Sequence, residues 1–251
     1  MKERIELNSL ALMVRKQFDE DAYSPIDIFA MVSGMKNLTI VFYPMSIRIS
    51  GMCIKDRGNI IIGINSDSSY GRRRYTLAHE LYHILFENGL NRSICEMSFT
   101  GEKNNSEKEA DIFASYLLMP YDGLRNYINN KGLDTSWKLS DVVAVEQFFQ
   151  ISHNAMLLRL LYEKYISKEE YIQFQNVGIT KIAISMGYSG DLYTKAADGK
   201  KYYTIGEYIR KVEKVAEKEL ISEGKREELL LDAFRADIVY GLTEEGMDLN
   251  D

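Results

Sequence analysis

The chain has 251 residues, of which 45% are apolar and 27% charged, and its net charge is −6. This composition is that of a folded protein with a sizeable core, and it excludes a disordered chain. The acidic balance also argues against a broad surface that neutralises nucleic-acid phosphates.

The cysteines and the N-terminal residues set further limits. Cys53 and Cys95 are far apart and lack CxxC spacing, so we expect free thiols rather than disulfides or a cysteine zinc site. The first residues are charged and do not resemble a signal peptide, and no segment is apolar for long enough to span a bilayer. We therefore predict a cytoplasmic protein with no membrane partner.

The first part of the chain predicts two helices and then a small sheet. Residues 8–19 show helical periodicity with Asn8 as a cap, and Ser24-Pro25 is typical of the start of a second helix that ends at Gly34. Three β-rich runs follow, at residues 38–43, 47–54 and 59–65. The last two runs are separated by a short turn, so we expect a hairpin within a small antiparallel sheet.

The next helix, over residues 76–86, carries two histidines four positions apart, His79 and His83, with Glu80 between them. On a helix this spacing places both imidazoles on one face, where they can bind one metal ion. The apolar residues fall on the opposite side of the helical wheel, so we expect the histidines to face a cleft. Two chance histidines on an ordinary amphipathic helix are the alternative.

A catalytic zinc ion usually has three protein ligands, so a third must come from elsewhere. The three-histidine motif of metzincins is absent, because Phe86 and Gly89 stand where it needs glycine and histidine. Glu87 continues the four-residue spacing, but three ligands along about 12 Å of helix cannot meet at one ion. We interpret Glu87 as a solvated residue at the helix end.

A better candidate lies on the helix predicted over residues 106–120. Glu107 and Asp111 share a face at the flank of its apolar stripe, whereas Glu109 points away. We predict that Glu107 is the third ligand and that Asp111 accepts the ring N–H of a ligating histidine and so fixes its tautomer. A merely acidic helix start, favoured by the helix dipole, would explain Glu107 and Glu109 equally well.

These residues carry a family resemblance. The segment Arg-Arg-Tyr-Thr-Leu-Ala-His-Glu-Leu-Tyr-His, followed by Glu-x-x-Ala-Asp-x-Phe-Ala-x-x-Leu-Leu-Met-Pro, resembles the ImmA/IrrE metallopeptidase family, and the likeness covers roughly residues 8–165. It implies that His79, His83 and Glu107 bind zinc and that Glu80 is the catalytic acid and base. Asp111 stands where the family often has asparagine. Members commonly act with a helix-turn-helix repressor on phages, mobile elements or toxin-antitoxin loci, and cleave it in the better understood cases.

The middle of the chain predicts further helices. Residues 121–131 form a short helix that ends near Gly132, and residues 140–165 resemble the helix-turn-helix-like segment that follows the protease core in this family. Acidic residues outnumber basic ones in this segment, so we expect it not to bind DNA. We interpret His153, at its turn, as a surface or packing residue.

The last third is predicted to be helical, apart from an irregular stretch over residues 187–203. Capping boxes at Ser167–Glu170 and Thr204–Glu207 start two helices, and a final helix covers residues 224–240. We interpret this region as an appendage that packs on the protease or recognises a partner. Three tyrosines are candidates for partner contacts, with simple packing as the alternative: Tyr193, Tyr202 and Tyr203.

Together the patterns predict an α+β protein with a mainly helical, zincin-like metallopeptidase core and a small antiparallel sheet over residues 1–132. A helix-turn-helix-like segment would cover 133–166 and a helical appendage 167–251. We expect Zn²⁺ at the three ligands to lower the pKa of a water to about 7, and Glu80 to pass that water's proton to the leaving amine. The strand over residues 59–65 would be the sheet edge that binds an extended substrate.

The expected partner is a protein substrate, a helix-turn-helix repressor or antitoxin, without direct contact to nucleic acid. The alternative is a non-proteolytic toxin or regulatory module that sequesters such an antitoxin and whose metal site is structural.

Overall fold

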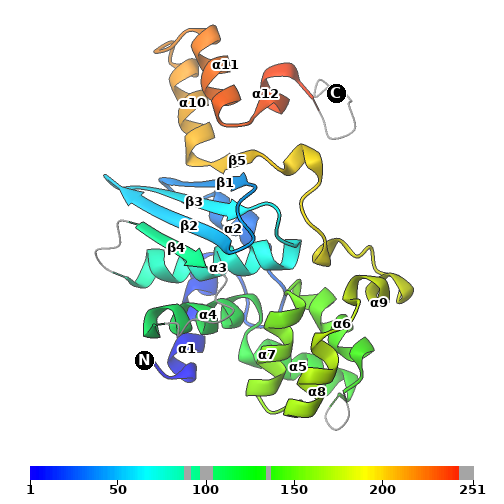
Figure 1. Ribbon diagram of the computed structural model, residues 1–251. Coiled ribbons are helices and arrows are strands. Elements are labelled where there is room, and N and C mark those ends of the chain that lie inside the picture. Colours follow the sequence, from blue (N-terminus) through cyan, green and yellow to red (C-terminus); the bar gives the residue numbers. More distant parts are fainter. Residues whose placement is uncertain (88–91, 97–103, 134–136, 243–251) are drawn as a thin grey trace.

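A computed structural model of the chain describes residues 1–87, 92–96, 104–133 and 137–242 (Figure 1). It combines many helices with one small sheet, so the predicted α+β class is confirmed. Within these ranges no helix has both the length and the apolar character needed to cross a lipid bilayer. The α-helices are α1 Arg4–Gln17, α2 Ile28–Ser33, α3 Tyr70–Phe86, α4 Asn105–Leu118, α5 Tyr121–Lys131, α6 Leu139–Phe149, α7 His153–Tyr162, α8 Lys168–Gln175, α9 Ile179–Ser185, α10 Glu207–Glu217, α11 Glu223–Asp232 and α12 Ala236–Tyr240.

The sheet has the strand order β4-β2-β3-β1-β5. Its strands are β1 Leu38–Tyr43, β2 Ile49–Asp56, β3 Asn59–Asn65, β4 Arg92–Glu96 and β5 Tyr203–Gly206. β2 and β3 form the predicted hairpin, but β3 pairs with β1 in parallel, so the sheet is mixed and not wholly antiparallel as predicted. The cause is the order of the strands: the chain reverses after β1 and again after β2, and β3 then lies beside β1 in the same direction.

This order also corrects the predicted substrate edge. β3 is flanked by β2 on one side and β1 on the other, so the hydrogen-bonding groups along both its edges are used within the sheet. Among the described strands, β4 and β5 are the two edges. The prediction that residues 59–65 offer an open edge to a substrate is therefore wrong.

The C-terminal third contributes β5, which was not predicted. β5 pairs antiparallel with β1 as far as Gly206, which pairs with Thr39. Gly206 has a φ of 102° and is the cap before the first residue of α10. The backbone N–H of Tyr208 then donates to Thr39 Oγ1 at 3.0 Å. The predicted capping box at Thr204–Glu207 is wrong, because Thr204 lies in a strand whose backbone is bonded to β1.

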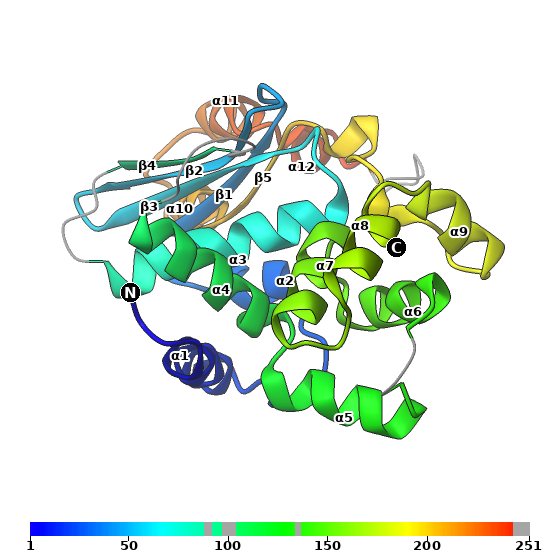
Figure 2. The ribbon, with the colours of Figure 1, turned by 60° about the horizontal axis from the view of Figure 1, so that its bottom comes forward.

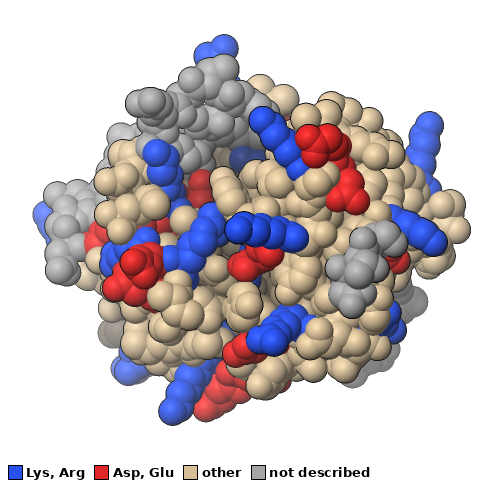
Figure 3. Space-filling view, turned by 90° about the horizontal axis from the view of Figure 1, so that it is seen from below, with Lys and Arg blue, Asp and Glu red and all other residues tan. Residues whose placement is uncertain are grey.

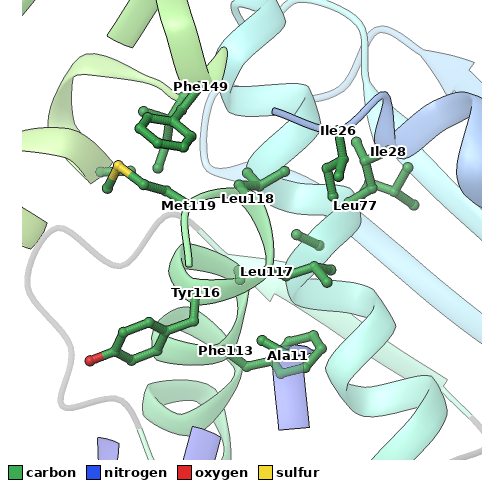
Figure 4. Close-up of a cluster of buried hydrophobic side chains, with 14 of the residues drawn as sticks. Ala11, Ile26, Ile28, Leu77, Phe113, Tyr116, Leu117, Leu118, Met119 and Phe149 are labelled. Carbon is green, nitrogen blue, oxygen red and sulfur yellow. The ribbon is translucent and has the colours of Figure 1, made fainter. Parts of the chain in front are cut away.

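The helices and the sheet share one core. α3 lies on one face of the sheet (Figure 1), where the inward side chains of β1 and β3 are fully buried. The cluster continues into the helical part, where α4 packs against α3 and α1 (Figure 4). Side chains that the figure shows there include Ala11, Ile26, Phe113, Leu117 and Phe149. The cluster extends from Leu7 to Phe174, and the predicted boundaries at residues 132 and 166 remain predictions.

Both N-terminal helices begin elsewhere than predicted. α1 starts earlier, and Asn8, the predicted cap, is buried within it and accepts a hydrogen bond from the backbone of Tyr121 at 3.2 Å. α2 is capped by Asp27 instead of starting at Ser24-Pro25. Ser24 lies outside the helix because its carbonyl accepts a hydrogen bond from the buried Arg15 guanidinium.

Helix ends in the second half agree better with the prediction. Gly132 ends α5 with a φ of 64°, and the capping box at Ser167–Glu170 starts α8. Residues 187–202 contain only short 3-10 turns, as expected of an irregular stretch. The helix predicted over 224–240 is split into α11 and α12, because Phe234 has a φ of 59° that a continuous helix cannot contain.

Candidate metal centre

α3 carries His79 and His83 one turn apart on one face, as the spacing predicts. The side chains are not open to a cleft, however: His79 is 1% exposed, His83 2% and Glu80 0%. The helical wheel predicted exposed imidazoles because it considers α3 alone. In the folded protein α4 packs against α3, and carboxylates from α4 and from the end of α3 cover the two rings.

α4 supplies the carboxylate that meets both rings. Asn104 caps this helix by accepting the Glu107 backbone N–H at 2.9 Å, which places Glu107 in the first turn. Glu107 Oε2 lies 3.2 Å from His79 Nε2, and Glu107 Oε1 lies 3.4 Å from His83 Nε2. The two Nε2 atoms are 3.1 Å apart.

These three side chains form a group that can hold a metal ion. One ligand atom from each lies within 4.8 Å of the others. Two imidazole nitrogens and one carboxylate oxygen are the protein ligands of many catalytic zinc sites, and they leave a further position open. Glu107 is 26% exposed, so the group is more accessible on the carboxylate side than on the histidine side.

A second carboxylate also lies beside the Nδ1 atom of each imidazole. Asp111 Oδ1 lies 3.0 Å from His79 Nδ1, which places Asp111 beside a candidate ligand as expected. Glu87 Oε2 lies 2.9 Å from His83 Nδ1, at ion-pair distance but without hydrogen-bond geometry. Glu87 is 26% exposed at the end of α3, so it is partly solvated as predicted but also contacts a candidate ligand, which was not predicted. Glu87 is too far along the helix to reach the metal position, but its four-residue spacing from His83 brings its carboxylate to Nδ1 of that ring. A carboxylate there favours the tautomer whose Nε2 is free to bind metal.

We expect Asp111 and Glu87, which we call the outer carboxylates, to raise metal affinity. Asp111→Ala and Glu87→Ala should each weaken zinc binding by about 10- to 100-fold, because the imidazole loses the partner that orients it. Competition with a chromophoric chelator measures this affinity. Glu217→Ala, at an exposed carboxylate on α10, is the matched control and should leave it unchanged. Equal affinity in all three variants would contradict the assigned roles.

Glu80 lies on the side of α3 that faces β2. Gly51 of β2 lies next to this side of α3, since a Cβ added at Gly51 would lie 2.6 Å from Thr76 Cγ2 and 3.9 Å from Glu80 Oε1. β2 can therefore approach α3 this closely only because residue 51 is glycine. Gly51 was not among the predicted site residues, although a glycine inside a β-rich run indicates a close backbone approach.

Glu109 points away from the metal group, as the helical wheel predicts, and ties α4 to α3. It accepts hydrogen bonds from the Tyr82 hydroxyl at 2.5 Å and from Lys2 Nζ at 2.8 Å. Burial alone would raise the pKa of Glu109, but these hydrogen bonds outweigh burial and lower the pKa to about 2.

This contact predicts an acid-dependent stability. Glu109→Gln should lower the free energy of unfolding at neutral pH by about 1–2 kcal/mol. The folded-state pKa of Glu109 lies below its ordinary value of 4.5, so the stabilisation is complete above pH 4.5 and is lost as the pH falls through about 2. Urea denaturation at a series of pH values measures it. A difference between wild type and variant that stays constant down to pH 2 would contradict this origin.

His153 is a packing residue and lies outside the metal group. Its Nδ1 lies 2.6 Å from Glu146 Oε1, and its Nε2 lies 2.9 Å from the Phe174 carbonyl. The Tyr193 hydroxyl donates to Glu146 Oε2 at 2.7 Å. This buried set joins α6 and α7 to the C-terminal end of α8 and to the 3-10 turn Asp191–Tyr193.

The remaining residues singled out from sequence lie apart from the centre. Tyr203 packs on the core from β5, while Tyr202 is 43% exposed and contacts Tyr43. Cys53 is a buried free thiol, and the side chain of Cys95 lies outside the described part of the structure.

A comparison with known protein families supports the presence of a metal centre here. A family model described as the IrrE N-terminal-like domain, Peptidase_M78, matches residues 37–161. The matched segment runs from β1 to α7 and contains the three candidate ligands, Glu80 and both outer carboxylates. No match to a curated protein was found. The match includes the two helices that carry the candidate ligands. The chain therefore belongs to the ImmA/IrrE family of metallopeptidases.

Proposed function

We propose that the protein is a zinc-dependent endopeptidase that cleaves a helix-turn-helix repressor or antitoxin. The observation that carries this proposal is the meeting of His79, His83 and Glu107 with a carboxylate behind each imidazole. This donor set fits Zn²⁺, and bound zinc would supply a Lewis acid that polarises a carbonyl and acidifies a water. The three side chains would hold the ion, and Asp111 and Glu87 would keep the two rings oriented.

Glu80 is the proposed acid and base. It directly follows His79 on α3, and its burial against β2 shields the carboxylate from bulk water. A carboxylate oxygen of Glu80 would accept a proton from the attacking water and then deliver it to the leaving amine of the peptide.

An extended substrate needs an open strand edge, and we place it along β4. β4 is bonded to β2 on one side, and none of the other described strands pairs with its outer side. It is also the edge strand that lies toward α4 in Figure 1. Backbone pairing of this kind favours unfolded or loop segments as substrates.

Two observations bear on direct DNA binding. α7 stands where a recognition helix would be expected, but Met156, Leu157 and Leu160 are fully buried and Arg159 is 2% exposed. On the face seen in Figure 3, positive and negative side chains are interspersed. Both observations favour a protein partner over nucleic acid.

A second candidate function is favoured by the burial of the histidines. With both imidazoles at 2% exposure or less, the metal could serve to hold α3 and α4 together. The protein would then act by sequestering a helix-turn-helix antitoxin without cutting it.

The test uses a helix-turn-helix protein encoded beside this chain as substrate. The endopeptidase proposal predicts one zinc per chain, two fragments of that protein after incubation, and no fragments after the zinc is removed by a chelator. Gel electrophoresis and mass spectrometry measure the fragments, and restored zinc should restore them. A stable complex with an intact partner in the presence of zinc, with no fragments, would support sequestration instead.

A further inference from the structure

A hollow of about 280 Å³ lies beside the metal centre, between α4, α7 and the start of α1. Figure 2 shows α4 and α7 next to each other on this side. Among the lining residues are Arg4, Lys108, Asp111, Ile112, Leu158 and Arg159. Asp111 is shared with the metal centre, since its carboxylate contacts His79. We call this space the α4–α7 hollow.

Arg159 has a buried hydrogen-bond donor, Nη2, without a partner among the described residues. Its side chain is 2% exposed. Nη1 donates to Ser115 Oγ at 3.1 Å, and Ser115 also lines the hollow, so the end of the guanidinium lies at its floor. Leaving a buried donor of a charged group unsatisfied costs free energy, which a ligand that accepts from it would recover.

The charges around the hollow favour an anion. The Arg4 guanidinium stacks over the Tyr162 ring at 4.2 Å, and Lys108 is exposed at the rim. Burial lowers the pKa of Arg159, and the positive charge of Arg4 lowers it further. The second effect shows that the two guanidinium groups repel each other. The nearby carboxylates already have partners: Asp111 contacts His79, and Glu163 lies 3.0 Å from Arg159 Nε.

The rest of the lining limits the size and kind of ligand. Ile112 and Leu158 give the hollow apolar walls, and its volume is below the roughly 300–1,000 Å³ that is typical of sites for whole small molecules. A short aliphatic stem that ends in a carboxylate fits these walls and the planar guanidinium at the floor.

We propose that the α4–α7 hollow binds a carboxylate and that its occupant is an acidic side chain of the polypeptide held at the neighbouring metal centre. The peptide origin of this carboxylate rests on the proposed peptidase function, whereas carboxylate binding itself does not. The hollow would thus select substrates with aspartate or glutamate at one position.

The first experiment measures binding without cleavage. The full-length Glu80→Gln variant, loaded with zinc and labelled at its Ile and Leu methyl groups, is titrated with N-acetyl-glutamate amide and, separately, with N-acetyl-glutamine amide. We expect the methyl signals of Ile112 and Leu158 to shift with the glutamate probe only. Equal shifts with both probes, or none with either, would overturn the proposal.

Charge variants at the rim test the same site without touching its buried floor. Arg4→Gln with Lys108→Gln should weaken the glutamate probe by roughly 3- to 30-fold, because two cations near the carboxylate are removed. Lys16→Gln, which removes an exposed cation from α1 outside the hollow, is the matched control. If the control and the double variant bind the probe equally, the hollow is not the site.

A second arm distinguishes the two sources of the carboxylate. A set of peptides with glutamate at each position in turn, paired with glutamine versions, is bound to zinc-loaded Glu80→Gln and followed by fluorescence anisotropy. At one position glutamate should bind more tightly, and the rim variant should remove that preference. No preference at any position, with the small probe still bound, would overturn the peptide origin. If the probe binds but wild type cleaves nothing, the peptidase proposal fails independently of the hollow.

Discussion

Glu80→Gln is expected to bind zinc like the wild type and to lose about 10²- to 10⁴-fold in the rate of substrate cleavage. Glutamine has nearly the same shape and is uncharged, so the packing of residue 80 against Gly51 is kept while the proton acceptor is lost. Zinc content by atomic emission and initial cleavage rates on the proposed helix-turn-helix substrate give the two measurements. Because the three candidate ligands are untouched, the loss should appear in the rate alone.

The matched control is the neighbouring thiol. Burial, and then the charge of Glu80, raise the pKa of Cys53 to about 12, so this thiol is protonated at neutral pH and is no nucleophile. Cys53→Ala changes a buried side chain of β2 beside Glu80 and should keep the cleavage rate within a few-fold of wild type. If Glu80→Gln cleaves as fast as Cys53→Ala, then Glu80 is not the acid and base of this site.

The parts of the site that follow from local spacing were predictable. His79 and His83 meet because they are four residues apart on a helix, and Glu107 joins them because it shares a face with Asp111 on a second helix. The contact of Glu87 with His83 also follows from local spacing. Glu87 was predicted only as a solvated residue because a third ligand at this spacing cannot reach the metal ion. The same four-residue spacing, however, places its carboxylate beside Nδ1 of His83.

Features that depend on distant parts of the chain were not predictable in this way. β5 reads locally as the start of a helix, and only its pairing with β1, more than 160 residues earlier in the chain, makes it a strand. The burial of His79 and His83 likewise results from the packing of α4 against α3, which a helical wheel does not contain. The sequence therefore predicts which residues meet more reliably than how exposed they are.

Two carboxylates near the start of α4, Glu107 in its first turn and Glu109 two residues later, should have separable effects. Glu107→Gln is expected to weaken zinc binding by more than about 100-fold, since it removes a proposed ligand, and to change the stability of the metal-free protein by less than about 0.5 kcal/mol. Glu109→Gln should do the reverse: it keeps zinc affinity and lowers stability by about 1–2 kcal/mol, because it weakens the contacts with Lys2 and Tyr82. Chelator competition and urea denaturation of the metal-free proteins measure both quantities.

Thermal unfolding with and without zinc provides a further comparison of the two variants. A ligand that binds only the folded state adds about 2.7 kcal/mol of stability at roughly 100 times its Kd. Wild type and Glu109→Gln should gain this increment at the same zinc concentration, and Glu107→Gln should gain almost none. An equal gain in all three would show that Glu107 is not a ligand, and the acidic start of α4 would then be explained by the helix dipole. Loss of the gain only in Glu107→Gln would show that metal binding and protein stability depend on different carboxylates near the start of α4.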